Sequence, residues 1–312
     1  MGGESKEEMR GRKELFFILF FILTDVLFAQ GSFSGDKGSS GVSAIPNISL
    51  PQNKKDSTSN WTNSLITRLN LSQAGFSNWK SGGENSFTWV GIIEGKYIYR
   101  DSIVDWRTQH KFSYGQNKQG SNSFRKNEDI IDFSSVFSYL LGLKIDPYFS
   151  ITLRTQFDKG YTYSGDKATE ISNFFDPGYV TQNVGFQYVY NTKFDIRMGF
   201  SVKETYTRKF TKYSDDPKTS DIEKVRVQPG AELVSNYNNK FDDKLNLKSK
   251  FELFSDFVSF NRIDLRWDTY ISYKVYKFIE LSFNYVMYYN FDESSQFQWK
   301  EIAAIGLTYE IF

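Results

Sequence analysis

The chain has 312 residues, of which 18% are aromatic and 24% are charged, and its formal net charge is only +1. A charge so close to zero gives no overall field that would attract nucleic acid, so nucleic acid is not an expected partner. The absence of cysteine and the presence of one histidine exclude disulfides, thiolate metal sites and multi-histidine centres, and we expect neither a metal nor another cofactor.

The N-terminal residues resemble an export signal. An apolar run over residues 15–23 follows the basic cluster Arg10-Gly-Arg-Lys13 and is too short to span a bilayer as a helix. We therefore predict a cleaved signal peptide over residues 1–29, with translation starting at Met1 or Met9. A retained N-terminal membrane anchor is the alternative.

Residues 30–60 are rich in Gly, Ser, Asn, Pro and Lys and show no hydrophobic period. Such a stretch is too poor in apolar residues to pack, and it predicts a flexible periplasmic leader. The remaining chain, 61–312, forms the predicted folded domain.

From residue 61 onward, apolar and polar residues alternate with a period of two, which predicts β-strands. In one segment Ile263, Leu265 and Trp267 occupy one phase, and Asp264 and Arg266 occupy the other. The pattern predicts twelve strands: 61–74, 86–100, 102–115, 129–145, one that follows Asp146-Pro147, 178–190, 194–206, 223–237, 245–257, 263–275, 279–291 and 297–311.

These predicted strands are about twice the usual length for a globular sheet. Long strands that are apolar on one face and charged on the other are typical of a wall with lipid on one side and a polar lumen on the other. We therefore predict an all-β fold: a single antiparallel, up-and-down transmembrane β-barrel of about twelve strands.

The predicted connections alternate in length. Short joins occur at Arg100-Asp101, Asp146-Pro147, Asn191-Thr192, Asn238-Asn239 and Tyr276-Lys277. Longer polar joins occur at 115–128, 159–176 and 207–222. Bacterial outer-membrane barrels have short periplasmic turns and longer extracellular loops, so this parity places both chain ends in the periplasm. A secreted soluble all-β binding protein, either a sandwich or a propeller, is the alternative fold, although such folds favour shorter strands.

The segment Asn70-Leu-Ser-Gln-Ala-Gly-Phe76-Ser-Asn-Trp79-Lys-Ser-Gly82-Gly-Glu-Asn85-Ser resembles the hallmark of a bacterial family catalogued as domain of unknown function three-zero-seven-eight. Similar blocks are Ile171 to Gly178, Val225 to Gly230, Leu245 to Lys250 and Gly306 to Tyr309. The resemblance implies a Gram-negative outer-membrane barrel, with membrane lipid and the barrel-assembly machinery as partners and with no established activity. The family ending Leu-x-Tyr-x-Phe is altered here, because Phe312 falls one residue outside the apolar phase.

The hallmark segment also contains the first candidate site. Trp79, Glu84 and Asn85 surround two adjacent glycines and offer one stacking ring and two hydrogen-bonding side chains, as a substrate-binding loop would. The alternative is a tight turn between strands, with the tryptophan as an interfacial anchor and asparagines as caps.

A second candidate is a ladder of charged residues in the predicted lumenal phase. The ladder consists of Arg226, Glu232, Lys248, Lys250, Glu252, Asp264, Arg266 and Asp268. Side chains facing each other on neighbouring strands lie about 5 Å apart, so opposite charges can pair. The ladder predicts either a polar solute path or, as we prefer, a salt-bridge network that fills a narrow lumen.

Catalysis has little support in the sequence. His110 is the single candidate base and shares the apolar phase with Trp106 and Phe112, while no G-x-S-x-G motif supplies a nucleophile. We therefore predict no catalytic residues. The predicted function is passage of small or amphipathic solutes across the outer membrane, or a structural role in the envelope. A lipid-modifying barrel enzyme is the alternative.

Overall fold

The computed structural model describes residues 60–77, 83–164, 167–216, 219–260, 262–291 and 296–311. The predicted signal peptide and nearly all of the predicted leader lie outside these residues. Within the described ranges, no helix combines the length and the apolar character that a membrane-crossing helix requires.

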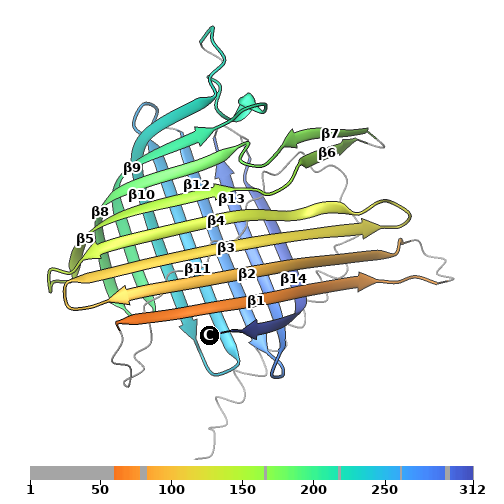
Figure 1. Cartoon of the computed structure of the whole chain (residues 1–312), viewed down its shortest axis with the longest axis horizontal. Coiled ribbons are helices and arrows are strands. Elements are labelled where there is room, and N and C mark those ends of the chain that lie inside the picture. Colours follow the sequence, from red (N-terminus) through yellow and green to blue (C-terminus); the bar gives the residue numbers. More distant parts are fainter. Residues whose placement is uncertain are drawn as a thin grey trace, which may run out of the picture.

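Twelve antiparallel strands form a closed barrel, which confirms the predicted fold class (Figure 1). The barrel strands are β1 (Trp61–Ala74), β2 (Ser86–Arg100), β3 (Val104–Gln119), β4 (Arg125–Tyr139), β5 (Ile145–Thr155), β8 (Gly178–Asn191), β9 (Phe194–Tyr206), β10 (Val225–Lys240), β11 (Leu245–Asp256), β12 (Ile263–Lys274), β13 (Ile279–Asn290) and β14 (Gln298–Glu310). Each strand is hydrogen-bonded to its neighbour in this order, and β14 returns to β1.

The first and last strands close the barrel near the short-turn end. Their paired stretch runs from Ile66 opposite Glu310 to Leu71 opposite Ile305. The N–H of Ile311 also donates to the carbonyl of Leu65 at 2.8 Å. Closure satisfies backbone groups that an open sheet would leave exposed to lipid, where an unpaired group costs several kcal/mol.

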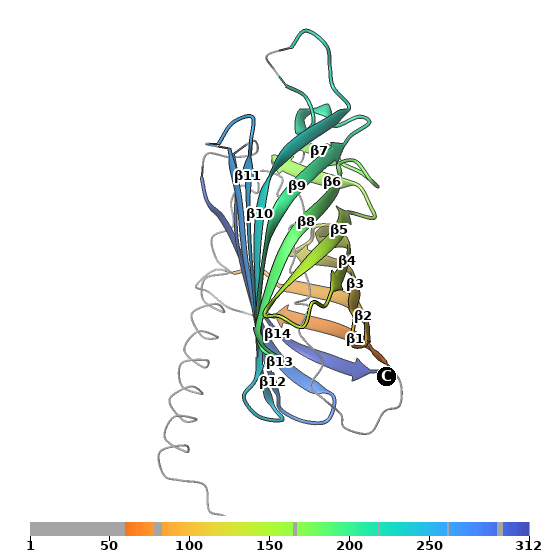
Figure 2. The same cartoon turned by 90° about the vertical axis from the view of Figure 1, so that its left-hand side faces the viewer.

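The barrel has two walls whose strands cross. Strands β1–β4 run across the front in Figure 1, and β10–β13 run steeply behind them. Figure 2 shows the same two walls from the side. Strands tilted by about 35–45° to a barrel axis cross on opposite walls in this way.

Two glycines allow close approach where β8 and β9 pair. Gly185 lies directly opposite Gly199. A Cβ atom added to Gly185 would lie 2.2 Å from the carbonyl oxygen of Met198, which is backbone and cannot rotate away. Glycine therefore permits a local curvature here that any larger residue would oppose.

The burial pattern is the reverse of that in a soluble protein. On β3 the inward side chains Asp105, Arg107 and Gln109 are only 1–3% exposed. On the outward face, Phe186 and Met198 are 62% and 61% exposed. Polar side chains thus fill the interior while large apolar ones cover the outside, as expected for a wall in contact with lipid.

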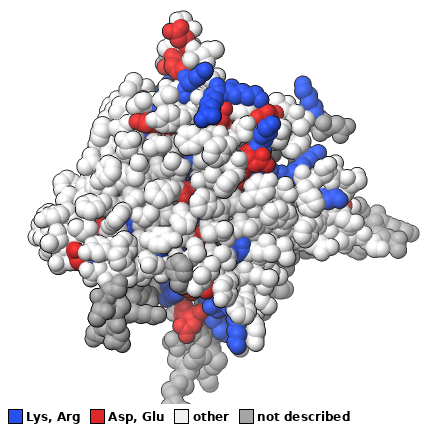
Figure 3. Space-filling model, in the orientation of Figure 1, with Lys and Arg blue, Asp and Glu red and all other residues white. Residues whose placement is uncertain are grey.

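Charged side chains are scarce over the middle of the wall. Figure 3 shows this surface as mostly uncharged, with Lys, Arg, Asp and Glu gathered near the β6–β7 hairpin and the adjacent loops and again at the lower end. A soluble sandwich or propeller would instead need a charged or polar outer face, so the apolar belt does not fit that alternative.

The predicted alternation of short turns and long loops is present, but two predicted turns are wrong. Asp146-Pro147 lies within β5, and the turn spans 140–144, where Gly142 adopts a φ of +72° and the Asp146 carboxylate accepts the N–H of Leu141. Asn238-Asn239 lies within β10, and the turn spans 241–244. In each case polar residues that resemble a turn signal lie within a strand and next to the true turn.

The predicted long join over 115–128 is also wrong in extent, because β3 continues to Gln119 and β4 begins at Arg125, with a bulge between Gly115 and Gln116. The largest loops connect β5 to β8 and β9 to β10. The first contains a hairpin, β6 (Gly160–Ser164) and β7 (Lys167–Ser172), and the second contains the short 3-10 helix η1 (Thr211–Tyr213).

Candidate functional site

Ion pairs cross the middle of the lumen. Arg154 on β5 contacts Asp132 on β4 at 3.1 Å and Glu252 on β11 at 3.7 Å. Strands β8–β10 separate β5 from β11, so the second contact spans the lumen and not the wall. Arg266 extends this set to Asp268 at 3.0 Å and to Glu252 at 3.9 Å. We call these five residues the central network.

A second network lies closer to the short-turn rim. The guanidinium of Arg68 on β1 contacts Glu94 on β2 at 2.6 Å and Glu280 on β13 at 3.6 Å. Tyr270 donates its hydroxyl to Glu280 at 2.8 Å, and its ring centroid lies 5.6 Å from the Arg68 guanidinium. Since the Arg68–Glu280 contact passes over β14, this basal network also joins non-adjacent strands.

Two further pairs connect distant strands on the long-loop side. Lys300 on β14 contacts Glu128 on β4 at 2.7 Å. Lys203 on β9 forms an ion pair with Asp264 on β12. The Lys203–Asp264 pair is largely shielded from bulk water, which strengthens its attraction relative to that of surface pairs, whereas the Lys300 side chain is partly exposed.

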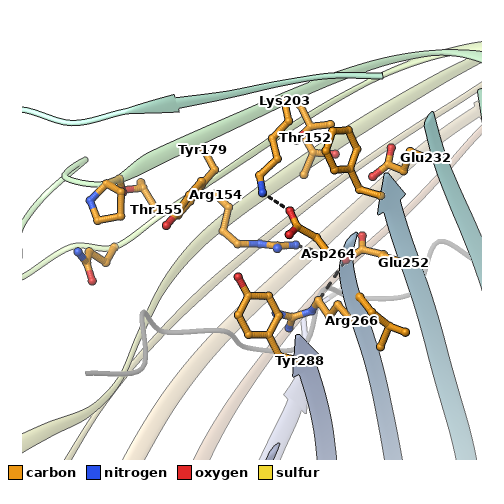
Figure 4. Close-up of a pocket in the computed structure, with 15 residues that line it drawn as sticks. Thr152, Arg154, Thr155, Tyr179, Lys203, Glu232, Glu252, Asp264, Arg266 and Tyr288 are labelled. Carbon is orange, nitrogen blue, oxygen red and sulfur yellow. Dashed lines mark hydrogen bonds and ion pairs between the residues drawn. The ribbon is translucent and has the colours of Figure 1, made fainter. Parts of the chain in front are cut away.

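A cavity of about 130 Å³ adjoins the central network, and Arg154, Glu252 and Arg266 of that network line it (Figure 4). Its lining combines charged residues, hydroxyls and aromatic rings. The labelled residues in Figure 4 are Thr152, Arg154, Thr155, Tyr179, Lys203, Glu232, Glu252, Asp264, Arg266 and Tyr288. Phe254 lies between two of the acidic side chains in the same lining. We call this space the outer chamber.

Loop residues border the outer chamber on its long-loop side. Thr155 donates its hydroxyl to the carbonyl of Pro177 at 3.0 Å, and Gln156 donates its amide to the carbonyl of Asn173 at 3.0 Å. The buried carboxylate of Asp176 accepts the backbone N–H groups of Arg208 and Lys209 at 3.0 and 2.8 Å. Asp176 therefore ties the β5–β8 loop to the β9–β10 loop and fixes the rim beside the chamber.

The β9–β10 loop has its own acidic anchor outside the barrel wall. Glu223 accepts the Thr219 hydroxyl and the backbone N–H of Asp216. These two hydrogen bonds lower the pKa of the Glu223 carboxyl to about 2, and the one from the Thr219 hydroxyl has the larger effect. The lowered pKa means that the ionised carboxylate is the form that holds this loop.

The structure places the predicted charge ladder on three consecutive strands, β10, β11 and β12. Lys250 lies directly opposite Asp268, and Glu252 lies directly opposite Arg266. Within β11, Lys250 also contacts Glu252 at 2.6 Å. Arg226 and Lys248 lie in the same phase, half-buried. The register thus brings the ladder together, while its role in solute passage stays a prediction.

The hallmark segment is described only in part. Trp79 lies outside the described residues. Asn85 accepts the N–H of Phe76 through its side chain at 2.6 Å, and its carbonyl accepts the N–H of Gly120 at 2.8 Å. Glu84 is exposed beside Gly120. Asn85 therefore stabilises the loop, and a substrate-binding role for this segment stays a prediction.

His110 packs as an aromatic ring on the wall. It lies across from Gly95, within 5.7 Å of the Tyr97 ring centroid and 5.4 Å of the Phe112 centroid. In the described part of the chain, no hydrogen bond joins its imidazole to another side chain. A general base needs a hydrogen-bonded nucleophile and an orienting partner, so this geometry offers no support for the enzyme alternative.

Sequence reasoning missed the residues that complete the central network from the opposite wall. Asp132 and Arg154 lie on β4 and β5. Their phase was readable from the sequence, because Ile131 and Phe133 flank Asp132 and the alternation continues through Leu153 beside Arg154. Their partners could not be read from the sequence, since contacts between non-adjacent strands depend on the cross-sectional shape of the barrel and not on strand register.

These features define a closed twelve-stranded antiparallel barrel with an apolar outer belt and an interior filled by ion pairs. Residues 71–161 match the family described as "Protein of unknown function (DUF3078)", which confirms the resemblance seen in the hallmark segment. Among curated proteins, none matches the chain.

Three solved structures illustrate the architecture that the chain is similar to. An outer-membrane channel from Pseudomonas putida F1 shares 10% identity and a TM-score of 0.38, with 84% of this chain and 98% of that chain covered. The translocator domain of the autotransporter NalP from Neisseria meningitidis shares 10% identity and a TM-score of 0.36, with 82% and 90% covered. The toluene transporter TodX from P. putida shares 8% identity and a TM-score of 0.28, with 80% and 88% covered. At these identities and TM-scores, the similarities carry no information about activity.

Proposed function

We propose that the protein is an outer-membrane β-barrel that is closed to free diffusion and that admits small solutes from the long-loop side into the outer chamber. The apolar outer belt and the backbone closure support the membrane location, because both are what lipid contact requires. Membrane lipid is then the direct partner of the wall, and the barrel-assembly machinery is the expected partner during biogenesis.

The contact between Arg154 and Glu252 carries the proposal that the lumen is closed. The two side chains start from opposite walls and meet at 3.7 Å, and Arg154 also holds Asp132. An open porin needs an unobstructed aqueous path, whereas charges of opposite sign that meet across a narrow lumen occupy that path. Solutes would pass only when these pairs separate.

Single-channel recording in a planar bilayer tests this closure. Wild-type protein should show little or no steady conductance. The Arg154→Gln, Lys203→Gln double variant leaves Asp132, Glu252 and Asp264 with fewer cationic partners, so it should open more often and prefer cations. A Lys209→Gln variant is the matched control, because Lys209 pairs with Glu170 at the exposed rim and should leave conductance unchanged.

Removing the cations of the predicted ladder extends the test. Replacing Arg226, Lys248, Lys250 and Arg266 by small neutral residues should likewise give cation preference. A wild-type protein with a large steady open state, or variants with unchanged ion preference, would overturn the closed-lumen proposal and favour a porin. A barrel that stays closed in every variant would favour a purely structural envelope role.

Fractionation tests the location. The mature chain, proposed to begin at Gln30, should be found in the outer-membrane fraction. It should also migrate faster on a denaturing gel before boiling than after, because a closed barrel resists unfolding by detergent. Recovery as a soluble periplasmic protein without detergent would contradict the membrane proposal.

A further inference from the structure

The outer chamber contains a carboxylate that differs from its neighbours in having no cationic partner. Glu232 on β10 projects into the chamber and accepts the side-chain amide of Asn183 at 2.7 Å (Figure 4). Among the described residues, no Lys or Arg nitrogen lies within ion-pair distance of it. The other two acidic side chains of the lining are paired, Glu252 with Lys250 at 2.6 Å and Asp264 with Lys203.

The strand register places Glu232 beside an aromatic ring. Glu232 lies directly opposite Phe254 on β11, and Phe254 lies directly opposite Asp264 on β12. Phe254 is therefore flanked by one carboxylate on each side, in a single row across three strands. The two carboxylates occupy equivalent positions relative to the ring, but only Asp264 has an ammonium group paired with it.

Lys203 shows what such a position holds. Its ammonium nitrogen pairs with Asp264 and lies 5.7 Å from the centroid of the Phe254 ring. A cation is attracted both by the carboxylate and by the negative face of an aromatic ring, and the attraction grows when water is excluded. The Glu232 side of the ring offers the same two groups to a further cation, because the nearest cations of the chain, Arg197 and Lys250, act on Glu232 from beyond ion-pair distance.

We propose that Glu232 and Phe254 form a binding subsite for the ammonium group of a small organic amine. The inference rests on the proposed function, because the chamber must be reached from the long-loop side. A chamber of about 130 Å³ has room for several water-sized groups, which suits an amine with a short alkyl chain.

The chemistry of the lining favours a simple cation over an amino acid or a carboxylate. Arg154 and Arg266 both contact Glu252, and each has a second carboxylate partner, Asp132 or Asp268. A ligand carboxylate would have to displace one of these carboxylates. A ligand ammonium would instead meet Glu232, whose hydrogen bond comes from the neutral amide of Asn183, and the ligand's alkyl chain could lie against the Phe254 ring.

Calorimetric titration of the detergent-solubilised full barrel at pH 7 with n-propylammonium tests the subsite. Saturable binding is expected, with n-propanol and propionate binding at least about tenfold more weakly, a ratio that corresponds to about 1.4 kcal/mol. Glu232→Gln keeps the size of the side chain and should weaken propylammonium binding about tenfold or more. Phe254→Leu should weaken it several-fold, in line with the loss of a partly desolvated cation–π contact.

Two further variants sharpen the test. Asp264→Asn releases Lys203, whose ammonium can then turn toward Glu232 and compete with the ligand, so binding should weaken although Glu232 is intact. Glu170→Gln removes a rim carboxylate whose ion pair is with Lys209 and should leave binding unchanged. Each variant should retain the unboiled gel shift of a folded barrel.

Equal binding of propanol and propylammonium, or unchanged binding by the folded Glu232→Gln variant, would overturn the subsite. That failure is separable from failure of the proposed function. If the wild-type barrel conducts little and does not bind the amine, only the subsite is contradicted. If the wild-type barrel shows a large steady conductance, the closed lumen is contradicted, whatever the titration shows.

Discussion

The two faces of the barrel wall are made from the same strands but are stabilised by different interactions. On β4, Phe133 points outward and is 38% exposed, while its neighbour Asp132 points inward, is 2% exposed and pairs with Arg154. The outward face needs only apolar character, because lipid adapts to its shape. The inward face needs specific partners, because a buried charge without one is costly.

The largest effect is expected from placing a charge on the outward face. Phe133→Arg, halfway along β4, should destabilise the folded barrel by about 2–4 kcal/mol because the guanidinium would face hydrocarbon. Asp132→Asn should cost less, about 1–2 kcal/mol, since Arg154 retains Glu252. Reversible unfolding in lipid vesicles by denaturant measures both values. Equal penalties at the two positions would mean that the assignment of faces is wrong.

A second comparison, within β8, sets a position that requires a very small residue against a neighbouring position that faces outward. Gly185→Ala adds a methyl group that would collide with the backbone of Met198, so it should destabilise by about 1–3 kcal/mol. Val184→Ala, on the adjacent outward position that is 56% exposed, is the control and should change stability by less than about 1 kcal/mol. The same unfolding assay applies. A harmless Gly185→Ala would show that the close pairing of β8 and β9 is not required.

A third comparison concerns two carboxylates in the loops at the rim, outside the barrel wall: one is buried and one forms an exposed ion pair. Asp176→Asn keeps the shape of the side chain but weakens its acceptance of the Arg208 and Lys209 N–H groups, and we expect a local loss of about 1–2 kcal/mol. Hydrogen exchange at these two amides should accelerate while exchange in β4 and β9 stays slow. Glu170→Gln, which breaks an exposed ion pair, is the control and should change little.

The smallest effect is expected from acid at the β9–β10 loop. The pKa of Glu223 is lowered to about 2 by its hydrogen bonds with Thr219 and Asp216, against about 4.3 for an unperturbed glutamate. A lowered pKa in the folded state stabilises the loop above the unfolded pKa, and this contribution is lost as pH falls from about 4 to about 2.

Pepsin cleavage of this loop in the intact barrel should therefore increase over that range when compared with a pepsin-sensitive reference peptide. Glu223→Gln should remove the pH dependence, because the replacement cannot titrate. A loop whose relative cleavage is the same at pH 4 and pH 2 in the wild-type protein would contradict the anchoring role of Glu223.

The sequence by itself determined the number of barrel strands, the facing of those strands whose apolar and polar phases it separated, and the alternation of short and long joins. These features depend on local periodicity: a residue such as Trp267 must face the opposite side from Asp268 because successive strand residues alternate. It also determined the ladder register in outline, since Glu252 and Arg266 lie on neighbouring strands joined by one connection. The turns at 140–144 and 241–244 were misplaced because Asp146-Pro147 and Asn238-Asn239 resemble turn signals while lying inside strands.

Only the tertiary structure decided which charges meet across the lumen and which carboxylate of the outer chamber has no ion pair among the described residues. Arg154 meets Glu252 although three strands separate β5 from β11, and Lys203 meets Asp264 although two strands separate β9 from β12. These contacts depend on strand tilt and on the close pairing at Gly185 and Gly199, which combine the geometry of all twelve strands. Glu232 differs from Asp264 for the same reason: a cation from a non-adjacent strand reaches one side of Phe254 and not the other.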